Sequence, residues 1–505
     1  MEKKIGIIIN EQVYQWQNEA IERIEMCGFK VTIFSLPGKA EPFSKDLQLS
    51  IFLEAKILRS SNKYLQVKSI NSSNIHPLRS VEELISKLDG GERFYYLISL
   101  ICFSENELTE ISKRLTTHVL QLSANVGEAL PLAQAVAAAY KNGESVINVS
   151  LKMFTQGTKS VQYESCNSIE HGLLLRSMNS TLAKSSLIYQ RFLENKLNAG
   201  NVISSDGIAT FHHGSERSYL GSFISHLFDK VYYKRQWILL YQTQPGQQLS
   251  DINSFKTHLP PASKFWADPF VVHHDNEHYV FIEELDNKSN KGFISYCKVE
   301  NDMMSEPLKI IDTSYHLSFP NVFKFENVYY MIPESSAANN IQLWCCNEFP
   351  DKWELHKVMI ENIKAVDSVV KYIHGKWWLF CTVKPLPDVS GNEELCVFYA
   401  DSPLSDQWIS HPKNPVCSDA RLGRNAGKIE MKDGRYFRYG QYSGYGYGKA
   451  ITKSEIIKIS ETEYQEKLIE MISPETSKGF DNLHTFNSNS YMTVGDALRR
   501  VRRFF

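Results

Sequence analysis

The second half of the chain repeats one hairpin pattern five times, and this repeat constrains the fold more than any other feature. In the first copy, the apolar run at residues 265–272 leads through a polar turn at 274–277 into the aromatic-rich run at 279–284. Apolar runs joined by turns rich in Asn, Asp and Gly are typical of β-hairpins. An aromatic residue near the start of each second run recurs at steps of about 50 residues, at Tyr279, Tyr330, Trp378, Tyr436 and Tyr491.

Repeats of this length indicate a propeller or a solenoid. Further strand-like runs lie between the hairpins, at residues 292–297, 341–345 and 396–400. Three or four strands per copy make one blade, so five copies predict an all-β, five-bladed propeller. We expect residues 236–241 to complete the last blade, because a ring of sheets closes well when both ends of the chain share one blade.

The first half of the chain predicts an α/β domain with a parallel sheet. An apolar run at residues 4–10, a helical pattern at 15–27 and a second apolar run at 30–36 give the order β-α-β. The pattern then predicts strands at residues 94–101, 118–122 and 145–154, and helices at 130–140, 169–197 and 219–233.

The length of the chain, 505 residues, exceeds what one hydrophobic core normally supports, which favours a multi-domain protein. We expect the α/β domain in residues 1–200, a linker and a short helix in 201–235, and the propeller in 236–505. Residues 198–217 are rich in Gly, Ser, Asn and His without periodicity, which predicts the linker itself.

Composition narrows the function classes. With 55 basic and 57 acidic residues the formal charge is −2, so we expect no nucleic-acid partner. The chain has no apolar run of bilayer length, and the apolar run that ends at Ile9 is short, so we expect no secretory signal. Nine cysteines without a Cys-x-x-Cys pair predict reduced thiols in a cytoplasmic protein.

Two further features of the sequence bear on metal binding and on contact with a membrane. The adjacent histidine pairs at 212–213 and 273–274 point their side chains apart in an extended chain, so we expect no metal site. The tail at residues 498–505 is basic and aromatic, which would suit peripheral contact with an anionic membrane. A solvated, frayed terminus is the alternative.

No Gly-x-Gly-x-x-Gly follows the first strand, so a dinucleotide site is not indicated. Residues 122–127, Pro131, 137–144 and 146–157 instead resemble the formyltransferase domain that uses 10-formyltetrahydrofolate. That resemblance implies an Asn, a His and an Asp that move a proton and stabilise developing charge. The His and Asp positions here hold Ser or Ala near 123–124 and Thr or Lys near 158–159, so we expect a degenerate domain without folate.

In a propeller, equivalent residues of all blades surround one axial pocket. Aligning the copies places the following near the axis: Asp268, residues 319–321, Asp367, residues 424–425 and residues 483–484. The next strand of each copy adds Glu283, Glu334, Thr382, Gln441 and Asp496.

The propeller motifs resemble two families. Trp-Ala-Asp-Pro at residues 266–269, followed by a Tyr-rich strand, resembles the first blade of family 43 glycoside hydrolases. The ordered set, which continues through Phe-Pro-Asn at 319–321, Arg-Asn-Ala-Gly at 424–427 and Leu-His-Thr-Phe at 483–486, is more similar to the N-terminal domain of glucosamine inositolphosphorylceramide transferases. Both resemblances imply that the propeller handles a sugar.

The hydrolase resemblance implies specific roles. An inverting pair of that kind holds its general acid and base about 6.5–9.5 Å apart. By motif, Asp268 matches the base and Asp367 the aspartate that adjusts pKa, whereas the acid has no matching motif, which leaves Glu334 and then Glu283. The substrate-binding candidates are Glu283, Arg424, Arg438, Gln441 and His484, with Arg424 expected to neutralise an anionic group of the substrate.

Each of these residues also has a structural interpretation. An Asp before Pro or Ser commonly caps a turn, the two glutamates could form salt bridges at the rim, and the arginines and Gln441 could link blades.

Taken together, the sequence predicts a carbohydrate-active transferase of surface polysaccharide or glycoconjugate biosynthesis, located in the cytoplasm or at a membrane periphery. Its expected substrates are a carbohydrate and a nucleotide-sugar donor. Three alternatives stay open: an intracellular glycoside hydrolase, an amino-sugar formyltransferase-like protein, and a glycan-binding module without catalysis.

Overall fold

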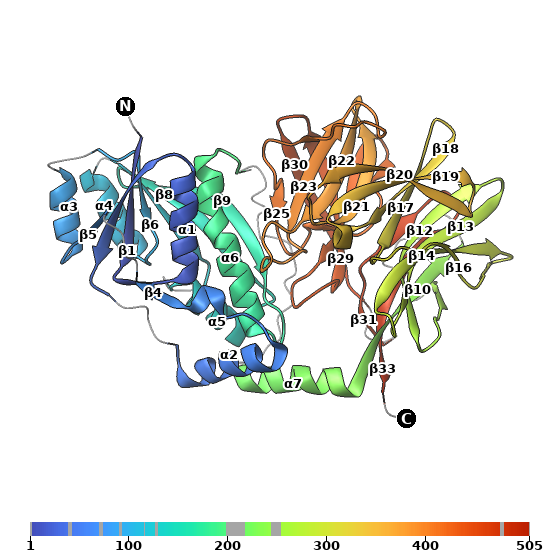
Figure 1. Ribbon diagram of the computed structural model, residues 1–505, viewed down its shortest axis with the longest axis horizontal. Coiled ribbons are helices and arrows are strands. Elements are labelled where there is room, and N and C mark those ends of the chain that lie inside the picture. Colours follow the sequence, from blue (N-terminus) through green and yellow to red (C-terminus); the bar gives the residue numbers. More distant parts are fainter. Residues whose placement is uncertain are drawn as a thin grey trace. The chain divides into compact units, whose positions relative to one another are not determined.

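The computed structural model describes residues 3–38, 43–69, 74–89, 93–115, 117–126, 130–197, 218–243, 254–474 and 479–503 (Figure 1). The chain forms two compact units, the first mainly of residues up to 202 and the second mainly of residues from 228 onward. The predicted linker at 198–217 lies outside the described residues. None of the helices in the described ranges combines the length and apolar character needed to cross a membrane.

The first unit is built on a seven-stranded sheet in the order β5-β3-β1-β6-β7-β8-β9. Its strands are β1 (Lys4–Asn10), β3 (Lys30–Leu36), β5 (Ile75–Pro77), β6 (Tyr96–Ser99), β7 (His118–Ala124), β8 (Val146–Thr155) and β9 (Thr158–Ser168). The predicted parallel sheet is confirmed for the five strands β5, β3, β1, β6 and β7. Strands β8 and β9 run antiparallel to their neighbours. Gln156 and Gly157 both have positive φ, and a two-residue turn of this kind joins only antiparallel strands.

Helices cover both faces of this sheet (Figure 1). Helices α1 (Gln15–Met26) and α6 (Leu174–Leu193) pack on the face that carries Ile7 and Ile9, and α3 (Val81–Asp89) and α4 (Glu105–Leu115) pack on the face of Ile8. The continuous apolar run of β1 therefore reflects burial on both sides. The remaining elements of the unit are β2 (Gln12–Tyr14), α2 (Lys45–Leu58), η1 (Lys63–Leu65), β4 (Val67–Ser69) and α5 (Leu132–Lys141).

The second unit is the predicted five-bladed propeller. Its first three blades are consecutive in sequence. Blade one holds β12 (Lys264–His274), β13 (Glu277–Asp286), β14 (Lys291–Glu300), β15 (Met303–Met304) and β16 (Leu308–Ile311). Blade two holds β17 (Ser318–Phe325), β18 (Val328–Glu334), η4 (Ser336–Ala338), β19 (Asn340–Glu348) and β20 (Lys352–Glu361). Blade three holds β21 (Ala365–Ile373), β22 (Lys376–Val383), β23 (Glu394–Ala400), β24 (Ile409–Ser410) and β25 (Cys417–Ser418).

The last two blades complete the ring. Blade four holds β26 (Arg424–Asn425), β27 (Glu430–Lys432), β28 (Arg435–Tyr442), β29 (Ala450–Ile459) and β30 (Tyr464–Ile472). Blade five holds β31 (Phe480–Asn482), β32 (Phe486–Ser488) and β33 (Thr493–Arg502), together with β10 (Tyr233–Gln242) and β11 (Lys256–His258) from the start of the unit. Helix α7 (Tyr219–Tyr232) directly precedes β10.

Ring closure by both ends of the chain is confirmed. Strand β10 pairs with β33 along its whole length, from Tyr233 opposite Arg502 to Gln242 opposite Thr493. The alternative of a frayed tail is wrong for residues 498–502, because their backbone groups belong to this ladder. Residues 504–505 lie outside the described ranges.

Four of the five predicted hairpin turns are tight. Both turn residues have positive φ, the geometry that matches strand twist in two-residue hairpins. The pairs are Asp275 and Asn276, Glu326 and Asn327, His374 and Gly375, and Asp433 and Gly434. The fifth connection is longer, and Tyr491 lies in it rather than in β33. In blade four the position equivalent to Tyr279 is held by Phe437, so the alignment by Tyr436 was shifted by one residue.

Candidate active site at the propeller axis

The innermost strands of the first three blades share one irregularity. In each, two residues oppose a single residue of the neighbouring strand, which is a β-bulge. The interruptions lie between Ala267 and Phe270, between Ser318 and Asn321, and between Val366 and Val369. The first bulged residue has a left-handed backbone in every case: Asp268 at φ 54°, Phe319 at 45° and Asp367 at 48°. Asp268 and Asp367 are therefore structurally equivalent residues of two blades.

The strand ladders confirm the predicted alignment of the second strands. Glu283 lies opposite Ala267, Glu334 opposite Ser318, Thr382 opposite Val366 and Gln441 opposite Arg424. In blade five, the N–H of Asp496 donates to the carbonyl of Thr485. Five equivalent positions thus face the same end of the axis.

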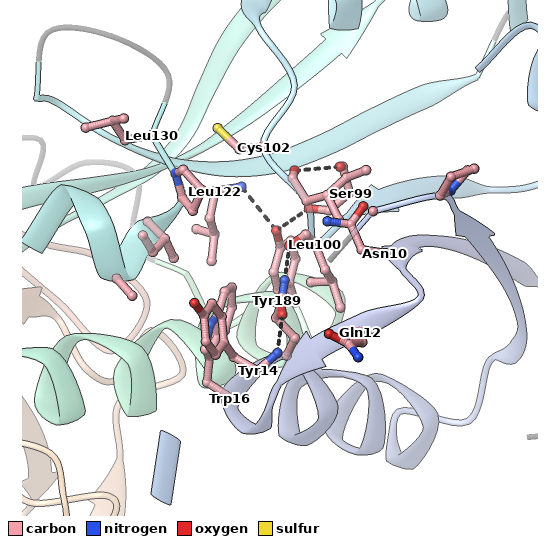
Figure 2. A pocket seen from close by; sticks show the side chains of 17 residues that line it. Asn10, Gln12, Tyr14, Trp16, Ser99, Leu100, Cys102, Leu122, Leu130 and Tyr189 are labelled. Carbon is pink, nitrogen blue, oxygen red and sulfur yellow. Dashed lines mark hydrogen bonds between the residues drawn. The ribbon is translucent and has the colours of Figure 1, made fainter. Parts of the chain in front are cut away.

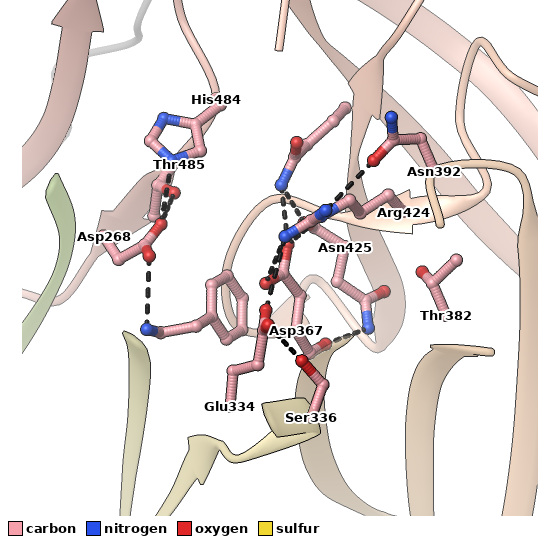
Figure 3. A network of polar contacts seen from close by, with 12 residues as sticks. Asp268, Glu334, Ser336, Asp367, Thr382, Asn392, Arg424, Asn425, His484 and Thr485 are labelled. Carbon is pink, nitrogen blue, oxygen red and sulfur yellow. Dashed lines mark hydrogen bonds and ion pairs between the residues drawn. The ribbon is translucent and has the colours of Figure 1, made fainter. Parts of the chain in front are cut away.

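Asp268 pairs with His484 (Figure 3). The same histidine pairs with Asp496, so the three residues form one buried ionic chain. His484 Nε2 lies 3.0 Å from Asp268 Oδ1, and His484 Nδ1 lies 2.8 Å from Asp496 Oδ1. Burial alone would lower the pKa of His484, but the two carboxylates raise it to about 10. Although burial opposes the effect, the imidazolium holds the pKa of Asp268 below its ordinary value. At neutral pH the chain therefore consists of a cation between two carboxylates.

Asp268 is closely enclosed. Its Oδ1 accepts a hydrogen bond of 2.8 Å from the Thr485 hydroxyl, its Oδ2 accepts one of 3.2 Å from the Phe319 N–H, and its side chain is almost unexposed. Ligand atoms of Asp268, His484 and Asp496 lie within 4.8 Å of one another, a spacing that could hold a metal. Because both ring nitrogens of His484 already bond to carboxylates, the three groups are satisfied without an ion.

Asp367 and Glu334 share the guanidinium of Arg424 (Figure 3). Nε and Nη2 of Arg424 donate to Asp367 at 2.6 and 3.1 Å, and Nη2 lies 3.3 Å from Glu334. Nη1 donates to Asn392 at 3.0 Å. Arg424 was expected to neutralise a substrate anion, but the structure commits its guanidinium to two protein carboxylates.

Gln441 supports the same carboxylate. Its Nε2 donates to Asp367 Oδ2 at 2.7 Å and to the Asn425 carbonyl at 2.8 Å. Burial raises the pKa of Asp367 well above its usual range; Arg424 opposes this shift and the Glu334 carboxylate adds to it. Two carboxylates around one guanidinium can therefore retain a proton.

Glu283 forms a second acid–histidine pair beside Asp268. His316 Nδ1 accepts a hydrogen bond of 3.0 Å from the Gly292 N–H, so Nε2 carries the hydrogen that faces Glu283 Oε1 at 3.2 Å. Burial raises the pKa of Glu283 to about 7, an effect that His316 opposes and Asp268 reinforces. Glu283 and Asp268 thus differ in protonation near neutral pH, as an acid and a base must.

Arg438 lies elsewhere. It donates to Glu466 at 2.8 and 2.6 Å, and neither side chain has any exposed surface. Its predicted part in substrate binding stays a prediction, because the structure shows Arg438 in a structural ion pair within blade four.

Three aromatic residues close to the site did not emerge from the repeat. Trp237 lies with its ring centroid 3.9 Å from that of His484, and Tyr447 lies 5.2 Å from the same ring. Tyr447 also stacks on Arg424, with 4.7 Å between Cζ and the ring centroid. His316 precedes the second blade by two residues. Trp237 and His316 stand outside the hairpin copies, so sequence alignment of the copies could not find them.

The first unit has its own cavity of about 280 Å³ (Figure 2). It lies where β1, β3 and β6 end, the point at which strand order reverses and open α/β sheets commonly bind ligands. Asn10, Gln12 and Ser99 contribute polar groups. The described residues that line it include no Asp, Glu, His, Lys or Arg. The described lining of this cavity therefore offers neutral hydrogen-bonding groups.

The chain therefore contains a five-bladed β-propeller with a cluster of buried carboxylates at its axis. Residues 253–493 match the sequence model of a family described as "Glucosamine inositolphosphorylceramide transferase 1, N-terminal". Over 221 residues, the chain is 34% identical to glucosamine inositolphosphorylceramide transferase 1 of Oryza sativa subsp. japonica, and equally to that of Arabidopsis thaliana. The alignments cover 43% of this chain and 29% of each relative, so the chain spans less than a third of their length.

Solved structures provide weaker likenesses. A family 117 glycoside hydrolase of Zobellia galactanivorans is 11% identical with a TM-score of 0.35, over 54% of this chain and 91% of that one. An exo-beta-1,3-galactanase of Phanerochaete chrysosporium is 11% identical with a TM-score of 0.33, over 45% of this chain and 56% of that one. In sequence, the propeller is similar to the family model named above and to part of each plant transferase.

Proposed function

We propose that the axial site binds a glycosyl group and that the protein is a carbohydrate-active enzyme of glycoconjugate assembly, which transfers a sugar from a nucleotide-sugar donor. The observation that carries this proposal is the contrast between Asp268 and Glu283. His484 keeps one carboxylate ionised, whereas burial lets the other retain its proton near pH 7. Environments that separate the pKa values of two neighbouring acids identify a general base and a general acid.

In the proposed reaction, the bond between the sugar and its leaving-group oxygen breaks as the acceptor hydroxyl attacks. Glu283 gives its proton to the leaving oxygen, and Asp268 takes the proton of the acceptor hydroxyl. Asp367 and Glu334, held by Arg424, bind sugar hydroxyls. Tyr447 and Trp237 supply apolar surface for a sugar face at the rim.

Glycan binding without turnover is the second candidate. The enclosure of Asp268 favours it, because a base that already accepts hydrogen bonds from Thr485, His484 and Phe319 has little room for an acceptor hydroxyl. The names of the relatives support the first candidate, since both are transferases.

A panel of nucleotide sugars, each with and without simple glycan acceptors, tests the proposal. We expect release of the nucleotide from at least one donor, dependent on acceptor and lost in Glu283→Gln. Free reducing sugar from oligosaccharides would indicate a glycosidase instead. Saturable binding without either product would indicate a binding module.

A further inference from the structure

A second cavity of the propeller lies away from the acids described above. Its volume is about 420 Å³, and its walls come from blades two, three and four. Lys371 follows Asp367 along β21, so this cavity lies toward the other end of the innermost strands. Lys428, in the connection between β26 and β27, also lines the cavity.

The cavity carries positive charge without a lining carboxylate. Lys371 and Lys428 are its charged residues, and the described residues that line it include no Asp or Glu. Glu430 is the nearest acid to influence Lys371, but it accepts hydrogen bonds from Lys453 at 3.1 Å and from the Tyr439 hydroxyl at 2.9 Å. A neighbouring cavity of about 550 Å³ shares both lysines and holds Glu430 and Glu470 on its own walls.

The two ammonium groups keep unused donors. Lys428 Nζ donates to the Val271 carbonyl at 3.1 Å, and the Lys371 side chain makes no hydrogen bond or ion pair within the described part of the chain. Lys428 Nζ also lies over the Phe270 ring, 5.7 Å from its centroid. An ammonium has three N–H donors, so the two lysines together keep donors for a ligand. Burial lowers the pKa of Lys428 to about 8, and the charge of Lys371 adds to the shift, which is the strain that an anion between them would relieve.

An aromatic wall stands beside the lysines. Trp377 and Tyr372 lie with ring centroids 5.7 Å apart, and Tyr436 and Phe323 also line the cavity. Tyr372 is about half exposed, so this wall presents ring surface to solvent. Flat apolar faces next to charged donors suit a ring that carries an anionic group.

We propose that this cavity binds an anionic sugar, whose carboxylate or phosphate lies between Lys371 and Lys428 while its ring packs against Trp377. Ammonium groups bind either anion as point charges. The site is separate from the acids at Asp268 and Glu283, so it stands whether or not those residues catalyse a reaction.

Titration calorimetry on the full chain tests the site with four probes: digalacturonate, glucose 1-phosphate, inorganic phosphate and maltose. We expect one of the anionic sugars to bind at least about tenfold more tightly than phosphate or maltose. Lys371→Met should weaken that binding by roughly ten- to a hundredfold, which is the usual effect of removing a hydrogen bond to a charged group. Lys324→Met is the matched control, because Lys324 is an exposed residue of β17 outside the cavity and should leave binding unchanged.

Lys371→Arg separates charge from shape, since it restores the cation and should recover binding relative to Lys371→Met. Glu283→Gln should not affect binding here, which distinguishes this site from the proposed catalytic one. Equal binding of maltose, or anion binding that survives in Lys371→Met, would overturn the proposal. If both anionic sugars fail to bind the folded wild-type chain, the proposal is also wrong.

Discussion

Asp268 and Glu283 show how the surroundings of a carboxyl group decide its chemistry. Both are almost completely buried, and they lie on paired strands of one blade. Asp268 receives a cation and two further donors, whereas Glu283 receives one histidine and the repulsion of Asp268. Burial therefore raises the pKa of Glu283, whereas His484 keeps the pKa of Asp268 low and the carboxylate charged.

Glu283→Gln should raise the stability of the protein at pH 8. The pKa of Glu283 rises from about 4.3 in the unfolded chain to about 7 in the fold. Its contribution to folding is complete below the first value and is lost as pH rises through the second, so ionised Glu283 destabilises the fold at pH 8. Gln resembles the protonated form and should raise the free energy of unfolding by about 1–3 kcal/mol. Equal melting of the two proteins at pH 8 would refute the raised pKa.

His484→Gln should change how the stability of the protein depends on pH between about pH 6.5 and pH 10. The pKa of His484 rises from about 6.5 unfolded to about 10 in the fold, so its stabilising effect is present below pH 6.5 and is lost toward pH 10. Over this window, deprotonation of His484 should lower the free energy of unfolding of the wild type by up to about 1.4 kcal/mol per pH unit. The difference between wild type and variant isolates His484 from Lys428 and other groups. Parallel melting curves from pH 6 to pH 10 would contradict the imidazolium.

Among the secondary-structure elements, the hairpin turns were predictable because the residues of the turn themselves determine its backbone conformation. Asn276, Gly375 and Gly434 occupy left-handed positions that these residues adopt readily. The bulges at Asp268, Phe319 and Asp367 were not predictable, because no residue type marks them in common. Their position depends on how the inner strands pack around the axis.

Leu240→Pro should destabilise the propeller by about 3 kcal/mol or more. Leu240 is central in its sheet, opposite Gly495 on one side and Thr257 on the other. Proline removes a ladder hydrogen bond there. The matched control is Ile469→Pro, because Ile469 is half exposed on edge strand β30 and falls between the paired residues Leu468 and Glu470. Thermal unfolding should show a much smaller effect for the control; similar losses would argue against closure by β10.

At the scale of the whole molecule, the sequence predicted both units because each depends on repeated, periodic signals. It also predicted the axial set, since equivalent positions follow from the repeat. It did not predict the partners of these side chains: Arg424 pairs with Asp367, and His316 bonds to Glu283 from outside the copies. Such partners depend on contacts between blades. The resemblance of the first unit to a formyltransferase remains a prediction.

Turnover by Asp268→Asn tests whether the axial carboxylates act on a glycosyl group. Asn is nearly the same shape and tolerates a left-handed backbone, but it cannot accept a proton. Breaking a buried ion pair should also lower stability, by about 3–5 kcal/mol, so the rate must be measured below the melting temperature of the variant. With the donor that the wild type uses, we expect Asp268→Asn to release nucleotide at least about a hundredfold more slowly. A folded Asp268→Asn protein that retains wild-type turnover would contradict it.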